Sequence, residues 1–159
     1  MARLSTFSPS YYSVRNEAGF RSGLEQKIAE ELESLGIQYR YEKDVLNYVQ
    51  PARAAKYHPD FLLPNGIVIE AKGRFLTKDR QKQLFVKKQH PLIDVRFVFS
   101  RAATRISKQS KTSYAMWCDR YGFPYADLSI PPEWLDEPVN TASLEAIEAA
   151  RMKPNLEDF

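Results

Sequence analysis

The segment that most constrains the fold is YHPDFLLPNGIVIEAKG, residues 57–73. Two short apolar runs flank Pro64-Asn65-Gly66, a combination that predicts a β-hairpin. The turn can contain two residues or three, and each length gives a different register. A two-residue turn would place Glu70 opposite Phe61, which puts a carboxylate on an apolar face. A three-residue loop avoids this and uses the glycine at the left-handed position that such loops often need.

The three-residue loop pairs Leu63 with Ile67 and sorts the hairpin into two distinct faces. A slip of one residue would turn every side chain to the other face, so the side-chain pattern selects the register. One face is then wholly apolar, with Phe61, Leu63, Ile67, Ile69 and Ala71. The opposite face, which we expect to be open to solvent, carries His58, Asp60, Glu70 and Lys72 beside Leu62 and Val68.

In this register Asp60 lies directly opposite Glu70, with Cβ atoms about 4.5–5.5 Å apart. Two carboxylates so close repel each other unless a proton or a cation intervenes. Hard cations such as Mg²⁺ take oxygen ligands of this kind. Lys72 lies two residues beyond Glu70 on the same face, where it can hold or deprotonate a water molecule or steady a phosphate oxygen.

The three residues form the D-x(n)-E-x-K pattern of metal-dependent nucleases. E-x-K alone is a weak signal, because a second copy occurs at 25–27 inside a predicted helix. Pro59 before the aspartate, the hairpin and the apolar opposite face make the match at 59–72 more specific. The alternative is an edge hairpin with a solvent-facing ion pair between Lys72 and one of the acids.

A helix is predicted from Ser22 to Gly36, since apolar residues recur at helical spacing: Leu24, Ile28, Leu32 and Leu35. Glu25 lies about 65° from the centre of this stripe, at the border of the buried face, from where it can reach a neighbouring sheet. Ser22 and Glu25 also form a capping box, and the residues alone favour a capping role for Glu25.

The remaining pattern predicts one α/β domain with a mixed sheet. Strands are expected at 37–43, 45–50 and 93–99, and helices at 77–90, 112–122 and 141–152. Thr77 and Thr112 are the expected N-caps of the first two of these helices. We divide the chain into a flexible N-terminal arm (1–19), a body (20–138) and an acidic C-terminal helix and tail (139–159). The acidic helix is expected to pack on the body or to screen basic residues.

Charge is unevenly distributed. Residues 72–111 contain twelve Lys and Arg against two acids, whereas residues 127–159 contain eight acids against two basic residues. A basic block of this kind indicates a polyanion such as nucleic acid, the alternative being a solvated basic face. The candidate DNA contacts, from the arm and the block, are Arg15, Arg21, Arg74, Lys78, Arg80, Lys87, Arg101, Arg105, Lys108 and Lys111.

Several protein classes are excluded by what the sequence lacks. A single cysteine, Cys118, excludes a cysteine-rich zinc module and fits a reducing compartment. Apolar runs are too short for a membrane span, and the N-terminus lacks the apolar centre of a signal peptide, so we expect a soluble intracellular protein. Trp117 and Cys118 are expected in the core, His58 as a solvated or packed side chain, and His90 at a helix end.

Five segments together resemble the bacteriophage endonuclease I family of junction-resolving nucleases: FRSGLEQKIAEELESLGI, PDFLLPNGIVIEAKG, KKQHPLIDVRFVFS, TSYAMWCDRYG and IPPEWLDEP. The likeness covers Phe20 to Pro138. It implies a restriction-endonuclease-like core of the PD-(D/E)xK superfamily, a mixed β-sheet flanked by helices, in a domain-swapped homodimer. A bridging strand between subunits is implied near residues 48–56.

The resemblance also implies a composite active site. Glu25 would come from one subunit, and Asp60, Glu70 and Lys72 from the other, which reverses the preference for a mere cap at Glu25. The implied metal-binding residues are Glu25, Asp60, Glu70 and Ala71, with two Mg²⁺ or Mn²⁺ ions in each site.

The implied substrate is branched DNA, chiefly four-way junctions, cut by paired nicks that leave 5′-phosphates, in the cytoplasm of an infected bacterial host. The likeness fails at both ends: residues 1–19 show little of it, and the acidic helix at 141–152 looks foreign to the family. The alternatives are a sequence-specific restriction or repair nuclease, a non-catalytic nucleic-acid-binding protein, and, more weakly, a protein-interaction module using the acidic tail.

Overall fold

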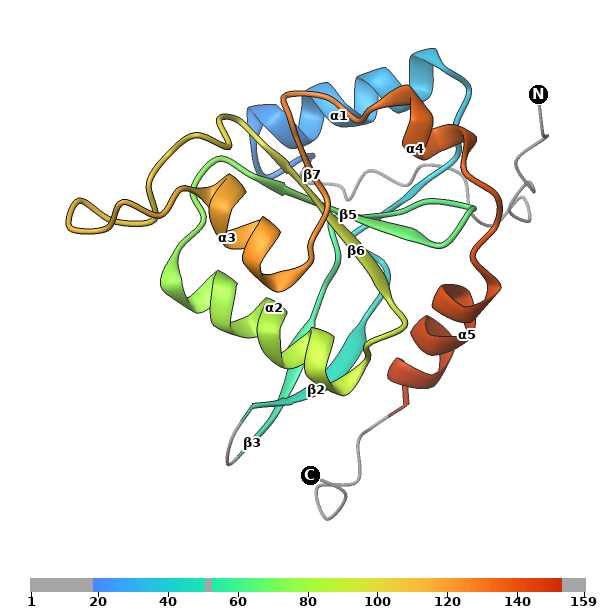
Figure 1. Ribbon diagram of the computed structural model, residues 1–159. Coiled ribbons are helices and arrows are strands. Elements are labelled where there is room, and N and C mark those ends of the chain that lie inside the picture. Colours follow the sequence, from blue (N-terminus) through green and yellow to red (C-terminus); the bar gives the residue numbers. More distant parts are fainter. Residues whose placement is uncertain (1–18, 51–52, 153–159) are drawn as a thin grey trace.

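The computed structural model describes residues 19–50 and 53–152 and shows a mixed sheet with helices on both faces (Figure 1). The predicted α/β class with a mixed, helix-flanked sheet is confirmed. The helices are α1 (Gly23–Ser34), α2 (Thr77–Gln89), α3 (Tyr114–Tyr121), α4 (Pro132–Asp136) and α5 (Thr141–Ala150). The strands are β1 (Arg40–Tyr41), β2 (Leu46–Gln50), β3 (Arg53–Tyr57), β4 (Phe61–Leu62), β5 (Ile67–Lys72), β6 (Asp94–Phe99) and β7 (Tyr125–Asp127).

The main sheet has the order β1-β4-β5-β6-β7. β4 pairs antiparallel with β1 and β5, whereas β5, β6 and β7 run parallel. Pairing of Phe61 with Ile69 confirms the predicted register. The loop closes as expected, since the N–H of Leu63 donates to the carbonyl oxygen of Ile67 at 2.9 Å and Gly66 has a φ of 89°.

The two predicted faces of the hairpin belong to two different cores. The apolar face of the hairpin packs against α1 and α4. The hairpin contributes Phe61, Leu63, Ile67, Ile69 and Ala71, and the helices contribute Ile28, Leu32 and Leu135. Leu62 and Val68 on the other face join α2, α3, α5 and the β2–β3 hairpin. Figure 1 shows α1 and α4 along one side of the sheet and α2 and α3 on the other.

The expectation that the polar face of the hairpin is open to solvent is wrong. β5 lies between β4 and β6, so it is an interior strand of the sheet. Its two faces are covered by the two cores, because Val68 belongs to one and Ile69 to the other. Glu70 is only 1% exposed and Asp60 8%. This position also excludes the alternative of a solvent-facing ion pair on an edge hairpin.

Of the expected helix N-caps, Ser22 is confirmed, whereas Thr77 and Thr112 each lie one residue from the observed cap. Ser22 caps α1 and accepts a hydrogen bond from the N–H of Glu25 at 3.1 Å, as expected from the sequence. Ser113, not Thr112, caps α3, which ends at Gly122 in the left-handed conformation. At α2 the expected cap Thr77 is instead the first helical residue and Leu76 is the N-cap, whereas His90 lies at the C-terminal end as predicted.

Residues 46–57 differ from expectation. The sequence pattern did not predict β3 as a separate strand; it pairs antiparallel with β2 to form a two-stranded sheet within one chain. The bridging strand implied at 48–56 falls on these two strands, and residues 51–52 between them lie outside the described residues. In the single chain the segment folds back on itself, so the bridge stays a prediction.

The acidic helix α5 packs on the body. Ser143 is fully buried; its hydroxyl donates to the carbonyl oxygen of Gly66 at 2.7 Å and accepts the N–H of Asp94 at 3.0 Å. Ile147 and Ala150 belong to the same core as α2 and α3. Of the two expected placements, α5 therefore takes the one on the body. Within the described residues, no helix combines the length and apolar character that a membrane crossing requires.

Candidate active site

Asp60 occupies the centre of the site, just before β4. Its carboxylate oxygen Oδ2 accepts the backbone N–H of Ala71 at 2.9 Å, and its own N–H donates to Oε1 of Glu70 at 3.4 Å. Continuing the β4–β5 register by one residue places Asp60 opposite Glu70, as predicted. Of the predicted metal-binding residues, Ala71 thus contributes its N–H to the aspartate, and a role for it at a metal stays a prediction.

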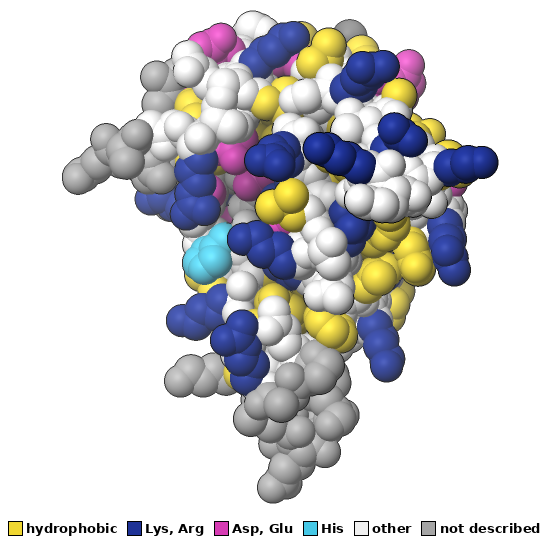
Figure 2. All heavy atoms as spheres, turned by 90° about the vertical axis from the view of Figure 1, so that its left-hand side faces the viewer, with side chains coloured by type: hydrophobic (Ala, Val, Ile, Leu, Met, Phe, Trp, Pro, Cys, Tyr) yellow, Lys and Arg dark blue, Asp and Glu magenta, His cyan; other side chains and the backbone are white. Residues whose placement is uncertain are grey.

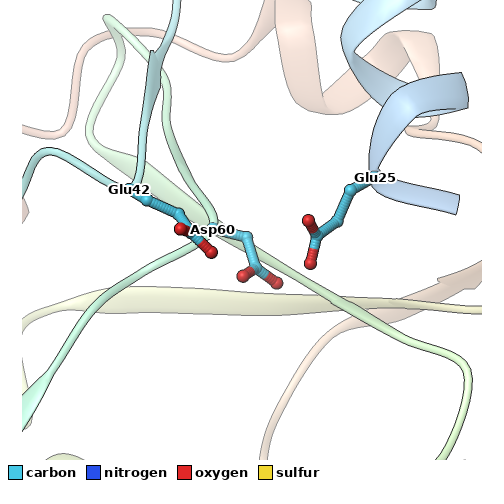
Figure 3. Close-up of side chains that lie close together, drawn as sticks. All are labelled: Glu25, Glu42 and Asp60. Atoms are coloured by element: carbon cyan, nitrogen blue, oxygen red, sulfur yellow. The ribbon is translucent and has the colours of Figure 1, made fainter. Parts of the chain in front are cut away.

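Three carboxylates converge on one point of the molecule. Oxygen atoms of Glu25, Glu42 and Asp60 all lie within 4.8 Å of one another. Figure 3 shows Glu25 pointing from the start of α1 toward Asp60, with Glu42 on the other side of Asp60. Carboxylate oxygens at these separations are the ligand set that Mg²⁺ and Mn²⁺ prefer, so the cluster could hold a divalent cation.

Glu25 is held at the start of α1 by hydrogen bonds to its backbone and to its carboxylate. Its N–H is capped by Ser22, and its Oε2 accepts the backbone N–H of Arg21 at 3.1 Å. The hydroxyl of Tyr41 also donates to Oε2. These bonds hold the side chain 7% exposed at the edge of α1, from where it faces Asp60.

Glu42 was not predicted as a site residue. It follows β1 with a φ of 51°, a conformation that is uncommon for residues other than glycine and that cannot be read from an alternating strand pattern. Its backbone N–H donates to the carbonyl oxygen of Asp60 at 3.4 Å. Its carboxylate also pairs with Arg21 at 3.0 Å, so this candidate DNA contact has an acidic partner.

Glu70 and Lys72 form the other half of the site. The hydroxyl of Tyr57 donates to Oε1 of Glu70, and the Nζ of Lys72 lies 3.7 Å from Oε2 of the same carboxylate. Lys72 also lies 4.0 Å from Asp79, near the start of α2. The structure therefore brings all four predicted catalytic residues together, and it adds Tyr57 and Asp79 around them.

The charges of the site act most strongly on Asp60 and Lys72. Burial, and then the charge of Glu70, raise the pKa of Asp60 well above its ordinary value, and Lys72 offsets only part of this. Burial by itself lowers the pKa of Lys72, but Glu70, Asp60 and other acids outweigh it and hold that pKa above its usual value. Burial and neighbouring acids thus disfavour the charged form of Asp60, and a bound cation would stabilise that charge.

The candidate DNA contacts are mostly exposed, and Figure 2 shows Lys and Arg side chains spread over the face that forms the left-hand side of Figure 1. Arg15 lies outside the described residues. Arg80 and Lys87 are partly buried; Arg80 donates to the carbonyl oxygen of Phe75, and Lys87 to that of Gly122 at 3.0 Å. The exposed ones are Arg21, Arg74, Lys78, Arg101, Arg105, Lys108 and Lys111.

Comparison with known proteins agrees with this geometry. The sequence matches the profile of the family described as Phage endonuclease I over residues 7–154. The chain belongs to the phage endonuclease I family. Endonuclease I of Escherichia phage T7 is 48% identical over 125 residues, which cover 79% of this chain and 84% of the phage T7 protein. Endodeoxyribonuclease 1 of Enterobacteria phage T3 is 46% identical over 129 residues, or 80% of this chain and 85% of the phage T3 protein.

The family match corrects one expectation. It extends beyond the range Phe20 to Pro138 at both ends, and it includes the whole of α5. The acidic helix is therefore not foreign to the phage endonuclease I family. Its buried contacts with the turn at Gly66 and with β6 give the physical reason, since α5 completes one of the two cores.

Proposed function

We propose that the chain is a structure-selective DNA endonuclease that resolves four-way (Holliday) and other branched DNA junctions by metal-dependent phosphodiester hydrolysis. Paired nicks on opposing strands would leave 5′-phosphate ends, and the enzyme would act in the cytoplasm of an infected bacterial host. The observation that carries this proposal is the convergence of three carboxylates beside Glu70 and Lys72 in a chain of the phage endonuclease I family.

Two Mg²⁺ or Mn²⁺ ions fit the donor set. Oxygen atoms of Asp60 lie near those of Glu25 and Glu42, and the N–H of Asp60 donates to Glu70, so Asp60 would contribute to the binding of both ions. When bound, the ions neutralise these carboxylates, activate water and stabilise the charge that develops on the phosphate and the leaving oxygen. Without positive charge, the acidic cluster would repel the phosphate that has to enter it.

Lys72 supplies a fixed cation beside the carboxylates. Because neighbouring acids hold its pKa above the usual value, its amine stays protonated at neutral pH. We therefore assign it the role of holding a phosphate oxygen or orienting the attacking water, and not that of a base. Glu70 restrains the amine at 3.7 Å, and Tyr57 restrains Glu70 in turn.

The basic side chains would contact backbone phosphates, which position DNA without reading its sequence. Selectivity for junctions would then depend on the shape and deformability of the DNA. A homodimer supplies two identical sites for two symmetry-related strands, which accounts for paired nicks.

Exchange between the subunits has a specific consequence. Glu25 and Glu42 precede β2, and Asp60, Glu70 and Lys72 follow β3. If the hairpin opens to bridge two subunits, each site keeps the same five residues but takes two from one chain and three from the other. We propose this exchanged arrangement, in line with the family resemblance.

The central test is cleavage of a four-way junction and of matching linear duplex, with Mg²⁺ and with EDTA. We expect Mg²⁺-dependent cutting of the junction only. Cutting of the duplex at a fixed sequence would favour a restriction or repair nuclease, and binding without any cutting would favour a non-catalytic protein. Glu70→Gln and Lys72→Ala should abolish cutting and leave junction binding largely intact; lost binding would assign these residues to the fold.

Mixed dimers test the exchange. A Glu25→Ala chain combined with a Lys72→Ala chain should regain one working site, because the intact halves meet in one heterodimer. Glu25→Ala combined with Glu42→Ala should not regain activity, since both changes precede β2. Absence of rescue in the first pair would show that each site belongs to one chain.

A further inference from the structure

A hollow of about 450 Å³ lies at the edge of the sheet next to the candidate active site. It is lined by residues 73–76, which follow β5, by residues 104–108 of the loop after β6, and by Tyr114. This basic hollow is as large as many small-molecule sites, which span about 300–1,000 Å³. None of the roles assigned above to the carboxylates or to Lys72 uses it.

The topology places this basic hollow beside the carboxylates. β5 and β6 are parallel neighbours, so both strands end at the same edge, and the segments that follow them line the same hollow. Crevices outside the carboxyl ends of parallel strands are favoured places for ligands. Lys72, the last residue of β5, directly precedes the lining segment, and its carbonyl oxygen accepts the N–H of Ser100 at 3.1 Å.

The charge of the hollow is wholly positive. Arg74, Arg105 and Lys108 line it and are exposed, and none of the three forms an ion pair with another residue of the described chain. Three like charges around one hollow repel each other, so an anion placed among them is favoured. The hydroxyl groups of Thr104 and Ser107 add hydrogen-bond donors to the same wall.

The walls of the hollow are held in place by the body. The N–H of Ala102 donates to Asp127 at 2.7 Å, and the N–H of Ile106 donates to the carbonyl oxygen of Thr112 at 2.9 Å. The hydroxyl of Tyr114 accepts the N–H of Phe75 at 3.2 Å, and its own N–H donates to the carbonyl oxygen of Thr104 at 2.8 Å, so Tyr114 joins the two lining segments. A site that is formed before binding loses little conformational entropy when it binds.

Apolar side chains lie between the charges. Leu76 is 43% exposed and Ile106 is partly buried, and both line the hollow. A cationic wall with hydroxyl donors and an apolar surface matches a deoxyribose joined to a phosphodiester. Phe75 and Tyr114 are buried, so the lining offers no exposed aromatic ring on which a base could stack.

We propose that this basic hollow binds the sugar–phosphate backbone of the cleaved strand at a phosphate that flanks the hydrolysed one. This inference rests on the proposed nuclease function and deepens it, because it names the part of the DNA held beside the catalytic residues. Binding there is independent of base sequence. It fixes the strand so that the neighbouring phosphate faces Lys72 and Asp60.

The first test measures junction affinity in metal-free buffer over about 50–200 mM salt, for wild type, Arg105→Gln/Lys108→Gln and the control Lys88→Gln. Lys88 belongs to the same basic block but lies at the other end of α2, outside the hollow. Each lost phosphate contact should reduce the log–log salt slope by about 0.9 and weaken binding about fivefold at about 0.15 M salt. The control should match wild type, and unchanged melting temperatures would show that all variants fold.

The second test neutralises one phosphate of the junction as a methylphosphonate, on either side of the cut. At one of these two positions the methylphosphonate should weaken binding by the wild type, but it should weaken binding by Arg105→Gln/Lys108→Gln little further. Equal losses in both proteins, or equal salt slopes for the double variant and the control, would overturn the proposal. Because both measurements report binding without metal, they stand apart from the cleavage assay, whose failure would instead refute the nuclease function.

Discussion

Asp60→Asn is expected to stabilise the metal-free protein while it abolishes cleavage. The change keeps the shape of the side chain and removes one buried negative charge. Unit charges 4.8 Å apart, the limit of separation from Glu25 and Glu42, repel by about 3.5 kcal/mol at an effective dielectric constant of about 20. Lys72 and the N–H of Ala71 offset part of this repulsion. We expect a net gain of about 1–2 kcal/mol in unfolding free energy, the usual scale of stabilising substitutions.

The gain should depend on pH with a defined sign. Because the pKa of Asp60 is raised in the folded state, the folded protein binds more protons at this group than the unfolded chain does. This carboxyl therefore lowers stability as pH rises from about 3.9, its unfolded pKa, through its folded pKa. The difference between Asp60→Asn and wild type should be small below about pH 4 and should grow as pH rises through that window.

Thermal unfolding in EDTA measures the effect, with Asp136→Asn as an exposed control on α4. Each kcal/mol should raise the melting temperature by about 2–4 °C for a chain of this size. Added Mg²⁺ should then stabilise wild type, by about 2.7 kcal/mol at a hundredfold excess over Kd, and have much less effect on Asp60→Asn. The reasoning is refuted if Asp60→Asn melts below wild type in EDTA, or if Mg²⁺ stabilises both proteins equally.

Three further substitutions test the surroundings of the site. Tyr57→Phe removes a hydrogen bond to buried Glu70 and should lower the unfolding free energy by about 1.5–3 kcal/mol. It should also raise the Mg²⁺ concentration needed for half-maximal cleavage, whereas the control Tyr48→Phe in the same hairpin should leave that concentration unchanged. Gly66→Ala should cost more than about 1 kcal/mol in chemical denaturation, because φ is 89° and the new Cβ would lie 2.8 Å from a backbone oxygen before α5; a neutral result would contradict the turn geometry. Ser143→Ala removes the hydroxyl's hydrogen bonds to Gly66 and Asp94 and should cost about 1–3 kcal/mol by the same assay, whereas an undiminished stability would show that these two bonds do not stabilise the protein.

The hairpin and the helix caps could be predicted because their determinants are local. The pairing of Phe61 with Ile69 follows from side-chain alternation and from a loop that needs a left-handed glycine. Ser22 caps α1 because its hydroxyl reaches an N–H three residues later. Each of these features is decided by sterics and hydrogen bonds within about ten residues, so the pattern is visible in the sequence.

The family resemblance supplied what local patterns could not, namely the preference for Glu25 as a site residue. The helix of Glu25 fits two interpretations, a cap and a ligand; in the structure its carboxylate accepts the N–H of Arg21, one residue before the cap Ser22, and faces Asp60. Sequence reasoning also expected a solvent-exposed polar face. Burial of Glu70 depends on β6, whose place beside β5 no short pattern reveals.

The sequence by itself determined the hairpin register, the carboxylate pair at Asp60 and Glu70 and the concentration of positive charge, since periodicity and turn chemistry act between near neighbours. Only the tertiary structure decided that Glu42 joins the carboxylates and that two loops enclose a basic hollow beside them. Those groups are distant in the chain, and their separation in space is set by how α1, β5 and β6 pack. Packing is a property of the whole core, which no single segment encodes.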